Sequence, residues 1–431
     1  MKPVLFLFSL AELVRLTLAQ VKVQNANIEP ELVVPDSYII KYKPKVSSSS
    51  QKKHEEVIHK KAKSKGKEGI VENIDLDGFK GYVAEIPSSE LREVIDSDLV
   101  SRSDLEPRWP GANLIVKVDY IEQDTIVNVS AVAAPSSGPI TKRGLASQAS
   151  APWGLARISQ VYSKKGVDAR YNYDSTAGSG STVYILDSGI RTTHKEFGGR
   201  ALWGTNFVSG SPDTDELGHG THVAGIVGGK TYGVAKGCRM YAVKVIDKDG
   251  LSSMSTTLQG LQWAVNHAKS RGITKKSIIN ASLGGPYTKI GNDAVKAATD
   301  LGITIVAAAG NDGSDAANYS PGSAPSAITV GAIDSSGYRT MWSNYGKVVD
   351  IFAPGSDILS AGHMSDSSSL YMSGTSMAAP HVAGLAAYFM AKEGLRGSSA
   401  VTKRIIGAAD TSGVYYAFDS PQRVAYNGGG K

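Results

Sequence analysis

The chain has 431 residues, of which 41% are hydrophobic, and a formal net charge of +6 at pH 7. This length predicts a large domain with an accessory one, and the composition, with 47 glycines, excludes a disordered chain and a coiled coil. The mild positive charge comes without the basic and aromatic motifs of nucleic-acid binding, and no apolar run reaches the ~18 residues that cross a bilayer. We therefore expect neither a nucleic acid nor a membrane as a partner.

The first residues predict a secretory signal over 1–19, and hence a secreted, extracellular protein. A leucine-rich apolar run begins at residue 4 and continues through residue 10. Glu12 and Arg15 interrupt the apolar region, so an ordinary apolar strand is the alternative. Secreted chains often carry disulfides, yet Cys238 is the single cysteine, and we expect it to be a small packed residue.

A smaller α+β domain is predicted for residues 20–145. Its expected elements are, in chain order, a strand at 37–42, a helix at 50–67, a hairpin at 70–86 that turns at Asp77-Gly78, a helix at 88–98 and strands within 112–132. This order matches a split βαβ arrangement. A Pro-, Gly- and Ser-rich segment at 133–139 then predicts an exposed linker.

The remainder, residues 146–431, predicts an α/β domain. Apolar strand-like runs at 183–187, 240–245, 278–282, 304–308 and 327–330 alternate with helical stretches at 222–228, 255–270, 292–301 and 376–392. Such alternation favours a mainly parallel sheet with helices on both faces.

Three segments of this domain combine into a candidate catalytic site. Asp187 ends an apolar strand, at the sheet edge where catalytic groups of α/β proteins gather. His219 stands between glycines at the start of a small-residue helix. Ser376 begins another helix, where unpaired N–H groups favour a developing negative charge, although a lone serine there is most often a helix cap. The order Asp, His, Ser differs from that of α/β-hydrolases and of chymotrypsin-like enzymes.

Five motifs around these residues resemble those of subtilisin-type serine proteases. They are Asp187-Ser188-Gly189, Gly218-His219-Gly220-Thr221-His222, Ser282-Leu283-Gly284-Gly285, Ala308-Ala309-Gly310-Asn311 and Gly374-Thr375-Ser376-Met377-Ala378. The chain is most similar to the proteinase K branch of secreted fungal subtilases, and it also resembles the cuticle-degrading proteases of nematode-trapping fungi. The resemblance implies a subtilisin-like fold and a monomeric serine endopeptidase of broad specificity for extended protein substrates, with Asp187, His219 and Ser376 as its triad.

The resemblance also implies roles for neighbouring residues. Asn311 would donate to the oxyanion through its side-chain amide, and an Asx turn before Asp312-Gly313 is the alternative. An uncharged pocket and an edge strand that pairs with the substrate would come from Gly250, Leu251, Ser282, Leu283, Gly284, Ala308 and Gly310.

The sequence offers two candidate metal sites, one for calcium and one for zinc. Likeness to proteinase K implies structural Ca²⁺, held by oxygen ligands as this cation requires. The ligands would be the carbonyl oxygens of Pro325 and Ala327 and the carboxylate of Asp350. His219 and His222 also have the i, i+3 spacing of zinc ligands on a helix, with Asp213 or Asp215 as a third ligand. A zinc hydrolase would leave the serine and asparagine motifs unexplained.

Residues 20–145 resemble the inhibitory prodomains of subtilases. Self-cleavage would follow Leu145, because the residues from Ala151 onward resemble the mature N-terminal region of proteinase K-like enzymes. A dibasic-processing enzyme would instead cut after Arg143.

A non-catalytic binding scaffold that keeps the fold is the main rival to the protease hypothesis. Such a protein has no need of Asp187, His219, Asn311 and Ser376 together. A lipase or esterase would carry Gly-x-Ser-x-Gly at its nucleophile, where this chain has Gly374-Thr375-Ser376-Met377-Ala378.

Overall fold

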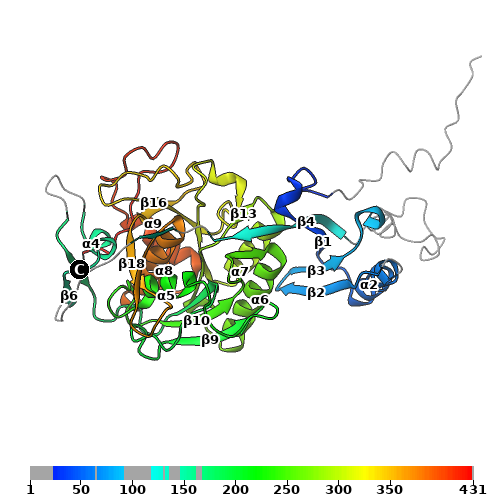
Figure 1. The fold of residues 1–431 in the computed structure, drawn as a ribbon, viewed down its shortest axis with the longest axis horizontal. Coiled ribbons are helices and arrows are strands. Elements are labelled where there is room, and N and C mark those ends of the chain that lie inside the picture. Colours follow the sequence, from blue (N-terminus) through cyan, green and yellow to red (C-terminus); the bar gives the residue numbers. More distant parts are fainter. Residues whose placement is uncertain are drawn as a thin grey trace, which may run out of the picture. The chain divides into compact units, whose positions relative to one another are not determined.

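The computed structural model describes residues 23–63, 66–91, 118–129, 132–134, 146–161 and 167–429 (Figure 1). The chain divides into two compact units: the first takes in residues 1–26, 36–73 and 80–123, and the second takes in 27–35, 74–79 and 124–431. The predicted secretory signal and the processing sites at Arg143 and Leu145 lie outside the described residues. No helix within the described ranges is long and apolar enough to cross a membrane.

The first unit is built on a sheet with the strand order β4-β1-β3-β2. Its elements are β1 (Val33–Tyr42), α2 (Ser48–Lys63), β2 (Gly69–Leu76), β3 (Phe79–Glu85) and the first part of β4 (Val118–Asn128). The antiparallel neighbours β1 and β3 bury Ile40 and Tyr82, and Ile58 of α2 packs into the same cluster. These elements follow the order predicted from the sequence, except that most of the helix expected at 88–98 lies outside the described residues.

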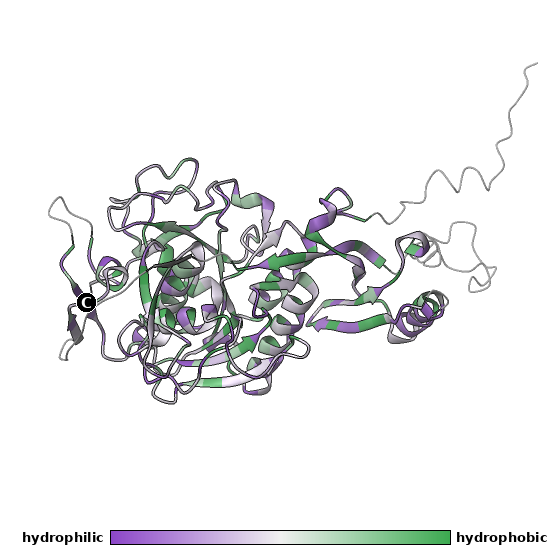
Figure 2. Ribbon diagram, viewed as in Figure 1, coloured by the Kyte–Doolittle hydropathy of each residue, from purple (hydrophilic) through white to green (hydrophobic). Residues whose placement is uncertain are grey.

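The second unit contains a parallel sheet with the strand order β17-β16-β14-β12-β8-β10-β9. Its strands are β8 (Thr182–Asp187), β9 (Ala201–Asn206), β10 (Arg239–Lys244), β12 (Ser277–Ala281), β14 (Thr304–Ala308), β16 (Ile328–Ile333) and β17 (Ile351–Pro354). Every residue of β8, β12, β14, β16 and β17 is buried, and Figure 2 shows hydrophobic residues along the central strands. The predicted α/β fold is confirmed.

Helices cover both faces of this sheet, with α5 and α8 on one face and α6 and α7 on the other (Figure 1). Their bounds are α5 (His219–Gly228), α6 (Met254–Ser270), α7 (Lys289–Asp300) and α8 (Thr375–Lys392); α4 (Trp153–Ile158) and α9 (Ser398–Ala408) lie near the two ends of this unit's sequence. The hydroxyl of Ser253 caps α6 by accepting from the N–H of Thr256 (3.1 Å). The hydroxyl of Thr288 caps α7 in the same way, with Gly291 as the donor (3.3 Å).

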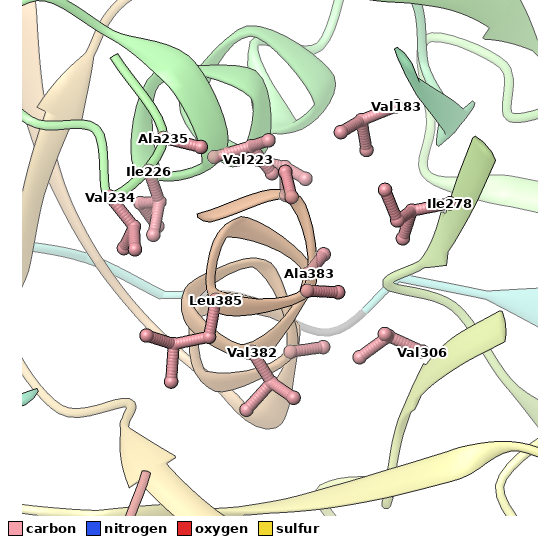
Figure 3. Packing of buried hydrophobic residues seen from close by; sticks show 14 of the residues in the cluster. Val183, Val223, Ile226, Val234, Ala235, Ile278, Val306, Val382, Ala383 and Leu385 are labelled. Atoms are coloured by element: carbon pink, nitrogen blue, oxygen red, sulfur yellow. The ribbon is translucent and has the colours of Figure 1, made fainter. Parts of the chain in front are cut away.

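α8 runs through the core of the second unit, and its residues from Thr375 to Met390 are all buried. In Figure 3, Ala383 and Leu385 of α8 lie among side chains of α5 and of three central strands. Small residues permit this close approach: a Cβ on Gly384 would lie 2.6 Å from the Cβ of Val234. Truncation of Leu385 to alanine would cost about 2–5 kcal/mol of stability. The helix therefore holds any group at its N-terminus in a fixed position.

Cys238 is completely buried in the same core cluster. Burial raises the pKa of its thiol to about 12, so the thiolate is strongly disfavoured. The expectation of a packed, unreactive cysteine is confirmed.

Candidate active site

Asp187 and His219 are joined by a short hydrogen bond. β8 ends at Asp187 and α5 begins at His219, and the Nδ1 of His219 lies 2.7 Å from the Oδ1 of Asp187. The N–H of Ser188 donates to the same oxygen (2.8 Å). Both side chains are buried, and the Nε2 of His219 has no hydrogen-bond partner among the described residues. One ring nitrogen is thus held by a carboxylate, while the other can take a proton.

A second buried carboxylate, that of Asp215, holds the start of α5. Its oxygens accept from the N–H groups of Gly218 (2.8 Å) and Thr221 (2.8 Å) and from the hydroxyls of Ser188 (2.8 Å) and Thr221 (2.6 Å). The hydroxyl of Ser188 accepts in turn from the N–H of Gly220 (3.0 Å). A Cβ on Gly220 would collide with the carbonyl oxygen of Gly189, so glycine is needed where α5 approaches the end of β8. The negative charge also suits a helix N-terminus.

Sequence reasoning missed Lys244, the last residue of β10. It pairs in register with Asp187, and its fully buried ammonium donates to the carbonyl oxygens of Ser188 (3.0 Å) and Thr214 (3.1 Å). The carboxylate of Glu216 lies 3.3 Å from the same nitrogen. A buried ammonium needs such partners. Its signal in the sequence was a lysine that ends an apolar strand next to the one that carries Asp187.

Ser376 is the second residue of α8 and is 2% exposed. Its hydroxyl donates to the carbonyl oxygen of Ser282 (3.0 Å), and the hydroxyl of Ser282 donates to the carbonyl oxygen of Ser376 (2.9 Å). The residue that precedes the helix is Gly374, and no side chain caps it, so Ser376 is not a helix cap. N–H groups in the first turn lack partners within the helix, which leaves the Ser376 N–H as a donor at the positive end of the helix dipole.

Asn311 follows β14 and lies beside the start of α8. Its side-chain oxygen accepts from the N–H of Thr375 (2.8 Å) and from the hydroxyl of the same residue (2.9 Å). That hydroxyl also accepts from the N–H of Gly310 (3.1 Å). The arrangement differs from an Asx turn, in which the side-chain oxygen of Asn311 would accept from the N–H of Gly313, because that N–H donates to the carbonyl oxygen of Trp342 (2.8 Å). The bonds to Thr375 orient the Asn311 amide next to the helix start.

A cavity of about 200 Å³ adjoins Ser376 and Asn311. Four of the predicted substrate-binding residues line it, namely Leu283, Gly284, Ala308 and Gly310. Ser282 contacts Ser376 directly, whereas Gly250 and Leu251 stand at the beginning of the short strand β11 (Leu251–Ser253). Glycine suits position 250, where φ is +83°. Four of the seven predicted residues thus surround this cavity and Ser282 lies beside it, while their role in substrate binding stays a prediction.

Of the residues proposed for calcium, Asp350 directly precedes β17 and Ala327 directly precedes β16, and these two strands are neighbours in the sheet. The Asp350 carboxylate accepts from the N–H of Thr329 (2.9 Å), two residues after Ala327. Burial raises the pKa of Asp350, because water is withheld from its charge. A cation would offset this, and carbonyl oxygens with a carboxylate are a donor set that suits Ca²⁺. The buried carboxylate of Asp350 therefore fits the chemistry of this ion, and the site itself stays a prediction.

The zinc alternative is wrong in its ligands. The Nε2 of His222 lies 3.0 Å from the carbonyl oxygen of Ile358 and 2.9 Å from that of Leu370, so this nitrogen is a donor to backbone. Burial lowers the pKa of His222 to about 3. Asp215 caps α5, and the side-chain oxygen of Asp213 bonds to Asn206 (3.2 Å). No group of three or more His, Cys, Asp or Glu residues in the described part of the chain could hold a metal ion.

Comparisons with known proteins find a matching family, similar sequences and a similar fold. A model of the Subtilase family matches residues 178–421. Subtilisin-like protease 2 of Pseudogymnoascus destructans is 42% identical over 400 residues, which cover 92% of this chain and 90% of that protein. Alkaline protease 1 of Aspergillus clavatus is 40% identical over 406 residues, 92% of each chain. A cold adapted subtilisin-like serine proteinase of known crystal structure matches with a TM-score of 0.61 and 38% identity, over 65% of this chain and 99% of that one.

Proposed function

We propose that Asp187, His219 and Ser376 are the catalytic triad with which this chain, a member of the subtilase family and a serine endopeptidase, cuts proteins. The observation that carries this proposal is the 2.7 Å bond between the Nδ1 of His219 and the Oδ1 of Asp187. It leaves Nε2, which has no partner among the described residues, as the base for a serine at the start of a buried helix.

The reaction would proceed through an acyl-enzyme. The hydroxyl of Ser376 turns from the carbonyl oxygen of Ser282 toward the Nε2 of His219, which takes the proton as the serine oxygen attacks the peptide carbonyl. Asp187 holds the imidazole tautomer and stabilises the imidazolium. His219 then returns the proton to the departing amine, and water, activated by the same imidazole, releases the acid product.

The oxyanion formed in each step would accept from the N–H of Ser376 and from the side-chain amide of Asn311. Both donors are oriented before the substrate arrives, the first by α8 and the second by its bonds to Thr375. Such preorganised donors stabilise a charge that develops only in the transition state.

Specificity would be broad. An extended substrate pairs its backbone with β11 on one side and with Gly284 on the other, so most of its hydrogen bonds are independent of its sequence. The walls formed by Leu283, Ala308 and Gly310 carry no charge and suit an apolar side chain before the scissile bond.

Calcium, secretion and a prodomain complete the proposal. Ca²⁺ at Asp350 would stabilise the fold and take no part in the chemistry. Residues 20–145 would act as an inhibitory prodomain, with Leu145 as the last residue before the mature, secreted and monomeric enzyme. Similarity to fungal proteases over 92% of the chain supports this organisation.

Labelling with a sulfonyl fluoride tests the proposed function. We expect one equivalent of label on Ser376, found by peptide mass spectrometry, with loss of peptidase activity. The variants Ser376→Ala and His219→Ala should resist the label, while Ser373→Ala, a nearby serine outside the triad, should react normally. A folded protein that takes no label and cuts no peptide would instead be the non-catalytic scaffold.

A further inference from the structure

The sheet edge that carries Asp187 holds two negative charges away from water. Asp187 is 0% exposed and Asp215 is 4% exposed. The Oδ1 of Asp187 accepts from His219 and from the N–H of Ser188, whereas its Oδ2 has no hydrogen-bond partner among the described residues. Buried carboxylates favour the protonated form of a neighbouring imidazole, and a base must be unprotonated to accept a proton. A positive charge nearby would offset part of this effect.

Lys244 supplies a positive charge in the same buried corner. Its side chain is completely buried, and β10, which ends at Lys244, pairs with β8 so that Lys244 lies opposite Asp187. Its ammonium donates to the carbonyl oxygen of Ser188 (3.0 Å). The N–H of Ser188 donates to Asp187, and its hydroxyl donates to Asp215. One residue, Ser188, therefore contacts the buried cation and both buried carboxylates.

Glu216 is the anionic partner of Lys244, and it is closer to water. Its Oε2 lies 3.3 Å from the Nζ of Lys244, and its side chain is 28% exposed, against 0% for that of Lys244. The hydroxyl of Ser211 donates to the same oxygen. Thr214 contributes a carbonyl oxygen to the ammonium (3.1 Å), which is a neutral acceptor. A charge that water reaches is screened more than a buried one, so Glu216 offsets Lys244 only in part.

Four other titratable groups lie around the start of α5. Burial lowers the pKa of His222 to about 3, so this histidine is neutral. The ring of His363 packs against Gly218, since a Cβ on that glycine would collide with it. The Nε of Arg191 lies 2.7 Å from the carboxylate of Asp366, so these two charges offset each other. Of the charged groups described around this helix start, the ammonium on β10 is therefore the fully buried cation.

We propose that the ion pair of Lys244 and Glu216 sets how far the pH can fall before His219 stops acting as a base. Lys244 is a positioning residue, because it acts through other groups. Its charge disfavours a proton on His219, and its hydrogen bond holds the peptide of Ser188, which orients Asp187. Glu216 weakens this effect by returning part of the negative charge. The inference rests on the proposed function.

The pH profile of kcat/KM tests the inference. It is measured from about pH 5 to about pH 9 on an uncharged apolar peptide, and the midpoint of its acid limb reports the protonation of the base in the free enzyme. Lys244→Met keeps the length of the side chain and removes the charge. Its midpoint should move up by about one pH unit, the size expected for one charge at short range in a partly dry site. Glu216→Gln should move the midpoint down, by a smaller amount.

Three further variants serve as controls. Lys244→Arg keeps the positive charge and should restore the wild-type midpoint. Lys248→Met removes an exposed lysine that pairs with Asp249, and its midpoint should stay at the wild-type value because water screens that charge. A histidine titrates near neutral pH, so the profiles are repeated in a His363→Gln background, where the same shifts should appear.

The profile separates an electrostatic role from a purely structural one. A structural loss would lower kcat/KM equally at every pH and leave the midpoint unchanged. Identical midpoints in the wild type, Lys244→Met and Glu216→Gln would overturn the inference. If a melting curve shows that Lys244→Met does not fold, Glu216→Gln decides the matter, because an unshifted midpoint there overturns the inference as well.

Sulfonyl fluoride labelling keeps this test apart from that of the proposed function. Label on Ser376 and normal peptidase activity, with unshifted midpoints, would refute the inference and leave the proposed function standing. A folded protein that takes no label and cuts no peptide would refute both.

Discussion

The histidine side and the serine side of the active site are stabilised by different interactions. His219 depends on two buried carboxylates: Asp187 bonds to its ring, and Asp215 holds its helix. Around Ser376 the partners are neutral, and Asn311 is oriented by the N–H and hydroxyl of Thr375. Hydrogen bonds to ionised groups are roughly twice as strong as neutral ones. The proposed base is therefore held by hydrogen bonds to charged groups and the proposed oxyanion donors by hydrogen bonds to neutral groups, so substitutions on the two sides should have different effects.

The largest expected effect is on the histidine side. Asp187→Asn should lower kcat about 10⁴-fold, as the same change does in another Ser-His-Asp triad, because the amide favours the wrong imidazole tautomer and cannot stabilise the imidazolium. Steady-state kinetics on an apolar peptide measures this. A melting curve on the same sample shows whether the fold is kept. A loss of less than tenfold in a folded variant would mean that Asp187 does not orient the base.

On the serine side, Asn311→Ala should lower kcat ~10²–10³-fold, the loss found for the equivalent donor in a subtilisin, with little change in KM. Thr375→Val, which removes one of the two bonds to the Asn311 oxygen, should cost only about tenfold. Thr375→Ser keeps the hydroxyl and is the matched control. If Thr375→Val were as damaging as Asn311→Ala, orientation alone would explain the role of Asn311.

Calcium removal should affect neither side directly. Ca²⁺ at a hundred times its dissociation constant would stabilise the fold by about 2.7 kcal/mol, so EDTA should lower the melting temperature of the mature enzyme and calcium should restore it. Activity at low temperature should survive chelation. The shift should be smaller in Asp350→Ala, and identical shifts in both proteins would place the ion elsewhere.

Asp215→Asn tests the second carboxylate of the histidine side. One of its oxygens becomes an N–H₂ group that faces donors, so we expect a loss of about 2 kcal/mol in stability and a modest fall in kcat with KM unchanged. Asp213→Asn, whose side chain bonds to Asn206, should behave like the wild type. Chemical denaturation and kinetics on both variants decide this. Equal stability of the two would show that Asp215 does not anchor α5.

The smallest expected effect is the pH dependence of stability that comes from two buried histidines, one on each side of the site. His222 follows His219 on α5 and His381 follows Ser376 on α8, and burial lowers their pKa values to about 3 and about 4. The pKa of these histidines in the unfolded chain is about 6.5, so below that pH they are protonated in the unfolded chain and neutral in the folded one. Above that pH neither histidine lowers the free energy of unfolding. Below it, each should lower that free energy by about 1.4 kcal/mol per pH unit.

The slope of unfolding free energy against pH between 6 and 4.5 measures this effect. His381→Gln should lose the contribution of one histidine to that slope, whatever its stability at neutral pH. An unchanged slope would mean that His381 is protonated in the folded enzyme.

The residues proposed as catalytic could be singled out from the sequence because each has a local signal. Asp187 ends a run of apolar strand residues, and His219 and Ser376 begin helices of small residues. Asp215 shows where such reasoning stops. Its place near two histidines suggested a metal ligand, but its partners include Ser188, which only the fold brings within 2.8 Å. Lys244 was missed for the same reason, since its role depends on carbonyl groups from two other segments.

The sequence by itself determined the alternation of strands and helices and indicated the proposed catalytic and pocket residues, because periodicity and small-residue motifs are properties of neighbouring positions. Only the tertiary structure decided how Thr375 orients Asn311 and which part of the chain pairs with β11. The resemblance of the residues from Ala151 onward to mature proteinase K-like enzymes predicted cleavage after Leu145, but nothing in the sequence indicated that Asn128 pairs with both Leu251 and Gly284. Backbone pairing across a sheet edge is nearly independent of side chains, so composition does not record which segment will form it.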